Sequence, residues 1–176
     1  VLYVELIFIS LPAVLCGCLY NNPDEIELTV SAPTPTYRSF AAKYFSIITM
    51  AAFPVVLFYG IVTCVYGTSF LMQGTLSFLV TSLFFSAGTA LFRLLFRNAY
   101  VTVSLFLIFL VSLALNHDAL KKGLRPFYFH YFDPYITDIA AGGRIWLINR
   151  LILLGASLLL LLGSFLLLKK DRLYHT

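Results

Sequence analysis

Five long apolar runs, separated by shorter polar stretches, constrain the fold of this chain more than any other feature of its sequence. The runs cover residues 1–20, 44–66, 70–92, 99–115 and 145–168. Each is long enough to cross a hydrocarbon core of roughly 30 Å as an α-helix, with 99–115 at the short limit. A helix satisfies its own backbone polar groups, and no run shows the alternation of a membrane β-strand. The sequence therefore predicts an all-α integral membrane protein with five transmembrane helices.

The composition excludes a soluble protein. Of the 176 residues, 60% are hydrophobic and 11% are charged, whereas soluble globular domains carry about 25% charged residues. So few polar side chains cannot cover the surface of a water-soluble protein. A disordered chain is also excluded, because disordered chains are poor in apolar residues. We expect residues 1–176 to form a single transmembrane domain, with membrane lipid among its partners.

The net charge of +4 comes from basic residues scattered at the ends of the apolar runs. This distribution lacks the clustered basic face of a protein that binds nucleic acid. Cytoplasmic flanks of membrane spans are enriched in Lys and Arg, and short flanks carry the most weight. The short basic flanks at 93–97 and 169–172 agree with each other, so we place the C-terminal tail and loop 21–43 in the cytoplasm. Loop 116–144 then lies outside.

Residues for catalysis or metal binding are sparse. Cys16 and Cys18 are two positions apart, so on a helix they point away from each other. The three histidines are far apart, and no HExxH sequence occurs. We therefore expect no bound metal and no enzymatic activity, with an intramembrane enzyme built on His130 and Asp133 as the third hypothesis.

The cytoplasmic loop 21–43 carries the most informative pattern. Asp24 to Val30 can form a short helix with acids in its first turn, and Pro33 and Pro35 interrupt it. Thr36 can cap a second helix that continues into the next apolar run. Such an elbow would be a rigid handle on the cytoplasmic face. The alternative is a solvated loop that only joins two spans.

The elbow resembles a cytoplasmic segment of ABC-2 type permeases, the membrane-spanning subunits of one class of ABC exporter. The family pattern there begins with a Glu and includes a small residue after it. A Pro lies six positions after the Glu, and a Lys lies ten positions after the Pro. Glu27, Ser31, Pro33 and Lys43 match this pattern, whereas Ala42 departs from the Gly that is common there. The Leu-rich last run and its basic tail are also similar to the end of many such permeases.

The resemblance implies a transport function. The chain would be a permease domain that lacks the first of six transmembrane helices, in a bacterial-type cytoplasmic membrane. No GxxxxGK[ST] sequence occurs, so ATP and Mg²⁺ would bind to a separate ABC ATP-binding subunit. A second permease copy or a homologous permease would complete the transporter. The residues expected to dock on the ATP-binding subunit are Glu25, Glu27, Ser31, Pro33, Tyr37, Arg38 and Lys43.

The outer loop is rich in aromatic residues, which prefer the headgroup region of a bilayer. It can be a membrane-anchoring belt or an outer gate that closes the translocation path. ABC-2 type permeases have short outer helices before their last span, and this resemblance favours the gate. The gate candidates are Phe127, Phe129, Tyr131, Phe132 and Tyr135.

Polar and small residues within the apolar runs are few. A charge inside the bilayer is costly, so Glu5, Asn149 and Arg150 are candidates for side-chain pairing or for substrate passage, although a long Arg can also reach the interface. Ser82, Ser86 and Ala90 recur every four residues, which favours close helix packing within the chain.

The expected function is therefore that of a permease subunit of an ABC-type exporter. The alternative is a non-transport membrane scaffold or assembly protein, which does not explain the spacing of Glu27, Pro33 and Lys43. Charge-poor spans favour a lipid, a drug or a hydrophobic peptide as the substrate.

Overall fold

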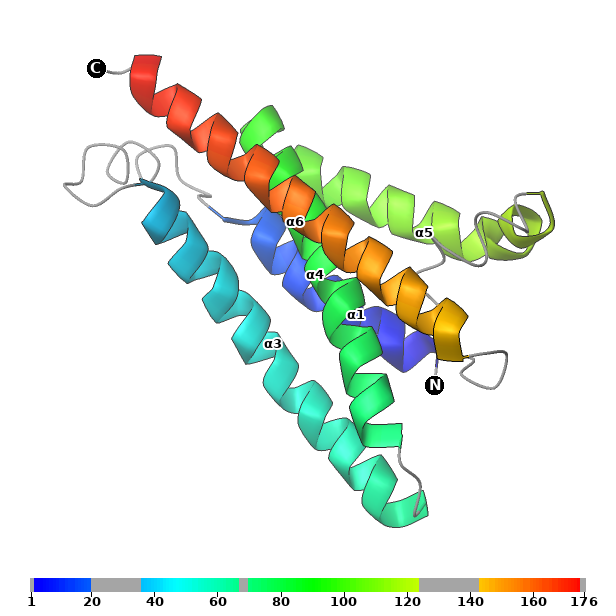
Figure 1. Cartoon of the computed structure of the whole chain (residues 1–176). Coiled ribbons are helices and arrows are strands. Elements are labelled where there is room, and N and C mark those ends of the chain that lie inside the picture. Colours follow the sequence, from blue (N-terminus) through cyan, green and yellow to red (C-terminus); the bar gives the residue numbers. More distant parts are fainter. Residues whose placement is uncertain (1, 20–35, 67–69, 124–142, 175–176) are drawn as a thin grey trace.

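The structure, a computed structural model, describes residues 2–19, 36–66, 70–123 and 143–174, and side chains over 9–19, 38–65, 74–112 and 146–169. All the regular elements in these ranges are α-helices (Figure 1), which confirms the all-α prediction for this part of the chain. The helices are α1 (Leu2–Gly17), α3 (Thr36–Tyr66), α4 (Phe70–Phe96), α5 (Ala99–Gly123) and α6 (Gly143–Tyr174).

Three of the described helices are long and apolar enough to cross a membrane. Their apolar segments are Arg38–Val65 in α3, Gly74–Phe96 in α4 and Trp146–Lys169 in α6. Helix α1 covers 16 residues, and the part of α5 whose side chains are described contributes a shorter apolar segment, Ala99–Ser112. Three such helices indicate an integral membrane protein. The prediction of five spans is confirmed for three.

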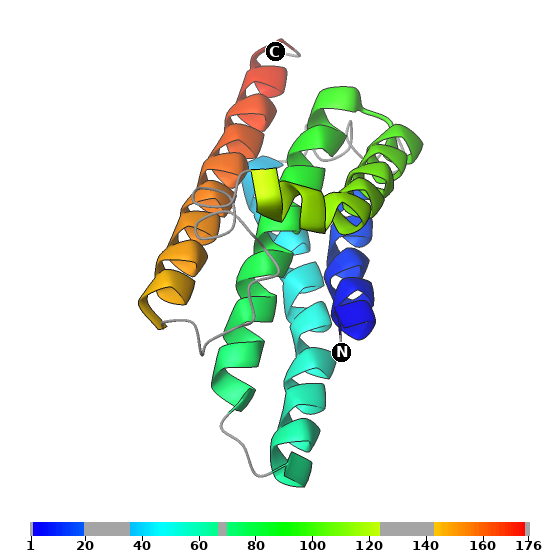
Figure 2. The ribbon, with the colours of Figure 1, turned by 90° about the vertical axis from the view of Figure 1, so that its right-hand side faces the viewer.

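Helix α4 lies at the centre of the bundle. In the most apolar part of α4, 56% of the residues are buried, against 17% in α3 and 28% in α6. The other four helices all pack against α4 (Figures 1 and 2). Helices α1, α4 and α6 run in one direction and α3 runs in the opposite one. The exposed side chains of α3, α5 and α6 include many large apolar ones, such as Met50, Ile108 and Leu159, as suits a hydrocarbon environment.

The basic connection predicted at 93–98 is mostly helical. Helix α4 continues to Phe96, and Arg93 is a buried residue of its last turns rather than a residue of an exposed connection. Arg97 ends the helix in the left-handed region with a φ of 53°. Asn98 caps α5, because its Oδ1 accepts hydrogen bonds from the backbone N–H groups of Tyr100 and Val101 at 2.9 and 3.3 Å. Two residues therefore suffice for the turn between α4 and α5.

The outer loop is shorter than predicted at both ends. Helix α5 continues to Gly123, although its apolar run ends at residue 115, and α6 begins at Gly143. The apolar run of a span ends where the hydrocarbon ends, whereas the helix itself can continue beyond that point. The residues 124–142 lie outside the described part of the chain.

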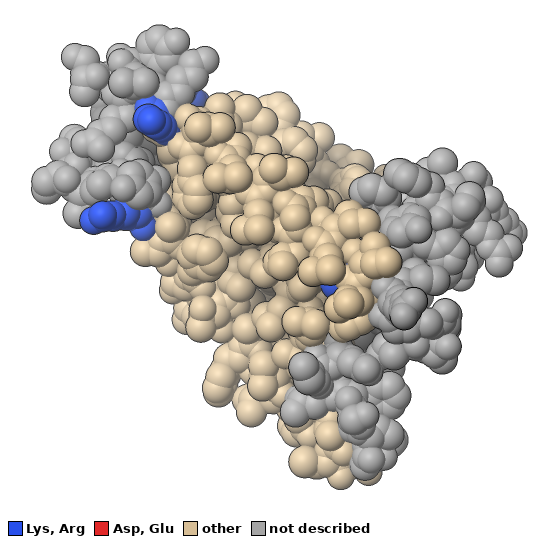
Figure 3. Space-filling model, viewed as in Figure 1, with Lys and Arg blue, Asp and Glu red and all other residues tan. Residues whose placement is uncertain are grey.

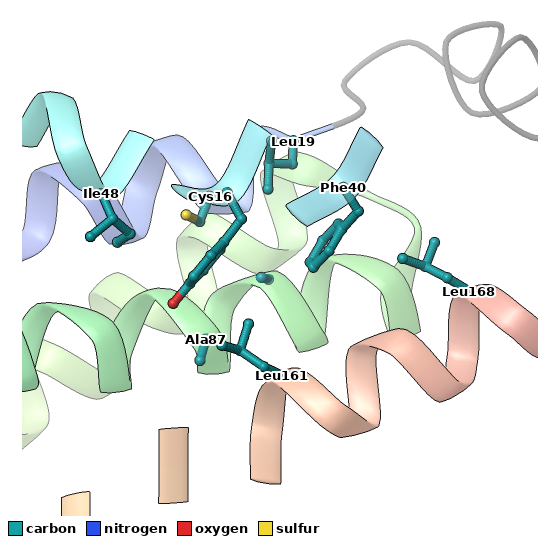
Figure 4. Close-up of a cluster of buried hydrophobic side chains, with 9 residues drawn as sticks. Cys16, Leu19, Phe40, Ile48, Ala87, Leu161 and Leu168 are labelled. Carbon is teal, nitrogen blue, oxygen red and sulfur yellow. The ribbon is translucent and has the colours of Figure 1, made fainter. Parts of the chain in front are cut away.

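Two clusters of apolar side chains hold the helices together. The first lies where α1, α3, α4 and α6 meet, and it is drawn in Figure 4. The second lies toward the opposite end and joins α1, α3, α4 and α5, with the rings of Phe85 and Phe106 edge to face and 5.8 Å apart. The buried members of this second cluster are Ile9, Ala13, Val55, Phe78, Phe85, Phe106 and Leu110.

The described basic side chains other than the buried Arg150 gather at one end of the bundle, where α3 begins and α4 and α6 end. Figure 3 shows blue Lys and Arg atoms at this end and an almost uncharged surface elsewhere on the described part of that face. The positive-inside rule assigns such an end to the cytoplasm, and we call it the basic end. Its members are Arg38, Lys43, Arg93, Arg97 and Lys169.

Candidate functional site

The apolar cluster nearer the basic end is where α3 enters the bundle. We call it the elbow junction, and it consists of Cys16, Leu19, Phe40, Tyr44, Ile48, Ala87, Ala90, Leu161 and Leu168. Figure 4 shows these side chains converging from α1, α3, α4 and α6. One change at this junction therefore affects four helices at once.

Two aromatic residues on consecutive turns of α3 form the centre of the elbow junction. Phe40 and Tyr44 are 1% and 0% exposed, and their rings are stacked with 6.2 Å between centroids. Phe40 also packs edge to face on Phe165 of α6 at 5.8 Å. The hydroxyl of Tyr44 donates a hydrogen bond to the backbone carbonyl oxygen of Leu83 on α4 at 3.2 Å. The first part of α3, at the basic end, is thus attached to both α4 and α6.

Helix α3 itself is continuous from the elbow into the apolar span. It covers 31 residues, Thr36–Tyr66, which confirms the prediction of a helix that continues from Thr36 into the next apolar run. Pro54 lies within this helix. Because proline has no backbone N–H group, the helix lacks one hydrogen bond there and can bend. From Thr36 to Phe53 nothing interrupts the helix, so this part can move as a rigid rod.

A second group of polar contacts joins α4 and α6 in the half of the bundle away from the basic end. We call it the polar seam, and it consists of the contact residues Ser77, Thr81, Trp146 and Arg150 together with Asn149, the buried neighbour of Arg150 in the sequence of α6. The indole Nε1 of Trp146 donates to Ser77 Oγ at 2.9 Å, and Arg150 Nη1 donates to Thr81 Oγ1 at 2.7 Å. One turn separates the two contacts on each helix, so they set the register of two parallel helices.

The two polar candidates of α6 in the polar seam are fully inside the protein. Asn149 and Arg150 are 0% and 3% exposed. The structure therefore brings Arg150 to a protein partner, Thr81, rather than to the membrane surface. This favours pairing over interfacial snorkelling for that side chain. Thr81 and Trp146 were not predicted from the sequence as its neighbours.

The small and hydroxyl side chains of α4 face protein. Ser82, Ser86 and Ala90 are 2%, 0% and 1% exposed, which confirms the prediction that this stripe packs within the chain. Thr89 bonds the carbonyl oxygens of Phe85 and Ser86 on its own helix. Small side chains let neighbouring helices approach α4 closely, and this explains its central place.

The predicted docking residues fall mostly outside what the structure describes. Helix α3 places the side chain of Arg38 in an exposed position and that of Lys43 in a half-buried one. The side chains of Tyr37 in α3 and of Glu5 in α1 lie outside the described residues. The same holds for the whole of the remaining docking and gate candidates, Glu25, Glu27, Ser31, Pro33, Phe127, Phe129, Tyr131, Phe132 and Tyr135.

Metal-ligating groups are not clustered in the part of the chain that the structure describes, since no three His, Cys, Asp or Glu side chains come together there. Cys16 is buried in the elbow junction, whereas Cys18 and Cys64 are exposed. No two of these three cysteines form a disulfide.

Comparison with known proteins adds no relative. The chain matches no family model, no curated protein and no solved structure.

Proposed function

We propose that this chain is a membrane-spanning permease subunit of an ABC-type exporter, which forms part of the translocation path and couples to a separate ATP-binding subunit. The observation that carries the proposal is the continuity of α3 from Thr36 into the span, with Phe40 and Tyr44 fixed to the bundle near its beginning. Coupling requires a stiff helix of this kind, because a force applied by the ATP-binding subunit at the membrane surface has to reach several spans at once.

The path of the motion follows from the contacts of the elbow junction. A displacement of the elbow moves the first part of α3 as a rod. Tyr44 passes this displacement to α4 through its bond to Leu83, and Phe40 passes it to α6 through Phe165. ATP binding on the partner subunit would drive the elbow, and the spans would open a path away from the cytoplasm.

The substrate class follows from the character of the spans. The three candidate spans are strongly apolar, with mean hydropathies of 1.7 to 2.7 over their most apolar segments. A strongly charged solute needs a polar lining, whereas a lipid, a drug or a hydrophobic peptide does not. We therefore propose an apolar or amphipathic substrate.

Gentle purification of the full-length protein from its native membrane tests the proposal. The expected result is a co-purifying polypeptide with a GxxxxGK[ST] sequence, together with ATP hydrolysis that requires both chains. A tag on an unrelated membrane protein of similar size controls for nonspecific capture. A chain that purifies alone, and gives no ATPase with any co-expressed candidate, contradicts transport and favours a scaffold or assembly protein.

A further inference from the structure

A buried arginine links two segments that lie far apart in the sequence. Arg93, near the end of α4, is 4% exposed, and its Nε donates a hydrogen bond to the backbone carbonyl oxygen of Leu19 at 2.9 Å. The two residues are 74 positions apart. Leu19 is itself buried in the elbow junction and directly precedes the segment 20–35.

The contact has a clear physical reason. The last carbonyl groups of a helix have no partner within the helix, and a positive charge near them is stabilising. Helix α1 ends in a tight turn, in which the N–H of Leu19 bonds the carbonyl oxygen of Cys16 at 3.2 Å. The carbonyl of Leu19 itself points beyond this turn, and the guanidinium of Arg93 satisfies it in a buried place. Arg93 thus caps the end of α1 from another helix.

Helix α4 consequently holds both the end of α1 and the early turns of α3. On the α1 side, Arg93 bonds the carbonyl oxygen of Leu19. On the α3 side, the carbonyl oxygen of Leu83 accepts the hydrogen bond from Tyr44. The Arg93 guanidinium and the Leu83 carbonyl belong to one helix, so this helix fixes the end of α1 relative to the early turns of α3.

We propose that Arg93 is a positioning residue for coupling, and this inference rests on the proposed function. It fixes the end of α1 on α4, so that a force that reaches the elbow junction displaces α1, α3 and α4 together. Without this contact, the end of α1 yields, and part of the displacement is lost before it reaches the spans.

Two substitutions and one control test the inference in the full-length protein. Arg93→Met removes the charge and the donor, and Arg93→Lys restores a charged donor. Arg97→Met removes a charge four residues further on, from an exposed position at the same end. A spin label on Cys18, with Cys16 and Cys64 replaced by alanine, reports the mobility of the end of α1. The ATP-binding subunit, co-purified with each variant, reports stimulation of ATP hydrolysis.

The expected results separate coupling from binding. Arg93→Met co-purifies the wild-type amount of the ATP-binding subunit, but its stimulation of ATP hydrolysis falls about tenfold and the label on Cys18 becomes more mobile. Arg93→Lys recovers part of both properties, and Arg97→Met changes neither.

Two results overturn the inference in different ways. Unchanged stimulation and an unchanged spin label in Arg93→Met, beside a wild-type protein that couples normally, refute the role of Arg93 and leave the proposed function intact. A wild-type protein that binds no ATP-binding subunit refutes both.

Discussion

The hydroxyl of Tyr44 donates a hydrogen bond to the backbone carbonyl oxygen of Leu83, and this bond joins the first part of α3 to the central helix of the bundle. Tyr44 has no exposed surface, so neither water nor a lipid headgroup can replace its partner. A helical carbonyl already accepts a bond within its own helix and has a second lone pair for such a contact. The bond therefore adds a directional constraint to an otherwise apolar junction.

Replacing Tyr44 by Phe should lower the free energy of unfolding in detergent by about 1 kcal/mol, because the ring stays in place and only the bond to Leu83 is lost. Tyr100→Phe is the matched control, since Tyr100 is 82% exposed and should tolerate the same change. Equal stability of the two variants would show that the Tyr44 hydroxyl contributes nothing.

Thr81→Val should destabilise the polar seam. It removes the oxygen that accepts a hydrogen bond from Arg150, and a buried group that loses its partner typically costs about 1–3 kcal/mol. Thr49→Val is the matched control, because Thr49 is exposed and bonds the carbonyl oxygen of Phe45 on its own helix. Unfolding in graded detergent mixtures measures both, and a larger loss for Thr49→Val would contradict the seam.

Two glycines should respond to alanine in opposite directions. A Cβ on Gly74 would lie 2.5 Å from the ring of Tyr59, whereas a Cβ on Gly60 meets nothing within 4 Å. We expect Gly74→Ala to cost about 1–3 kcal/mol through overpacking, and Gly60→Ala to stabilise α3 by about 0.5–1 kcal/mol. Thermal unfolding distinguishes them, and Tyr59→Leu should restore part of the loss in Gly74→Ala.

Cysteines placed at Thr36 and Phe129 should react with a membrane-impermeant maleimide from opposite sides of the membrane. The background protein has its three native cysteines replaced by alanine. The positive-inside rule predicts that Thr36 lies in the cytoplasm, and the predicted span at 99–115 then places Phe129 outside. Reaction of both sites from one side would refute this topology.

Glu27→Gln and Pro33→Ala should weaken capture of the ATP-binding subunit roughly tenfold if these residues lie at the centre of the docking surface. Membrane insertion should stay normal, because neither residue belongs to a span. Asp138→Asn is the control, since it makes the same kind of change as Glu27→Gln in the predicted outer loop. Full capture and full ATPase stimulation by the double variant of Glu27 and Pro33 would contradict the elbow assignment.

Sequence reasoning succeeded where local chemistry decides the structure. Capping chemistry and two prolines predicted the helix that begins at Thr36. The four-residue spacing of Ser82, Ser86 and Ala90 predicted a packed face on α4, because small side chains favour close approach in a membrane. Neither inference needs knowledge of the partner helix.

Long-range placement could not be predicted in the same way. In a bilayer both lipid and protein neighbours are apolar, so hydropathy does not distinguish the inner face of α3, with Phe40 and Tyr44, from its outer one. In the sequence, Arg93 looks like an ordinary basic residue at the end of a span. Nothing in the sequence indicates that it is buried and bonded to Leu19. The partner of Arg150 likewise depends on the register of α4 against α6, which the sequence does not specify.

The common direction of α4 and α6 has a consequence for biogenesis. Two neighbouring helices that run the same way cannot enter the membrane as a hairpin, so α5 has to cross back before α6 arrives. Until then Ser77 lacks the indole of Trp146 and Thr81 lacks the guanidinium of Arg150, although the Thr81 hydroxyl keeps its hydrogen bond to the carbonyl oxygen of Ser77 within α4. A nascent chain that has released α4 but not yet α6 therefore has this polar face of α4 without its partner helix, and the insertion machinery or a membrane chaperone can cover the face at this stage of synthesis.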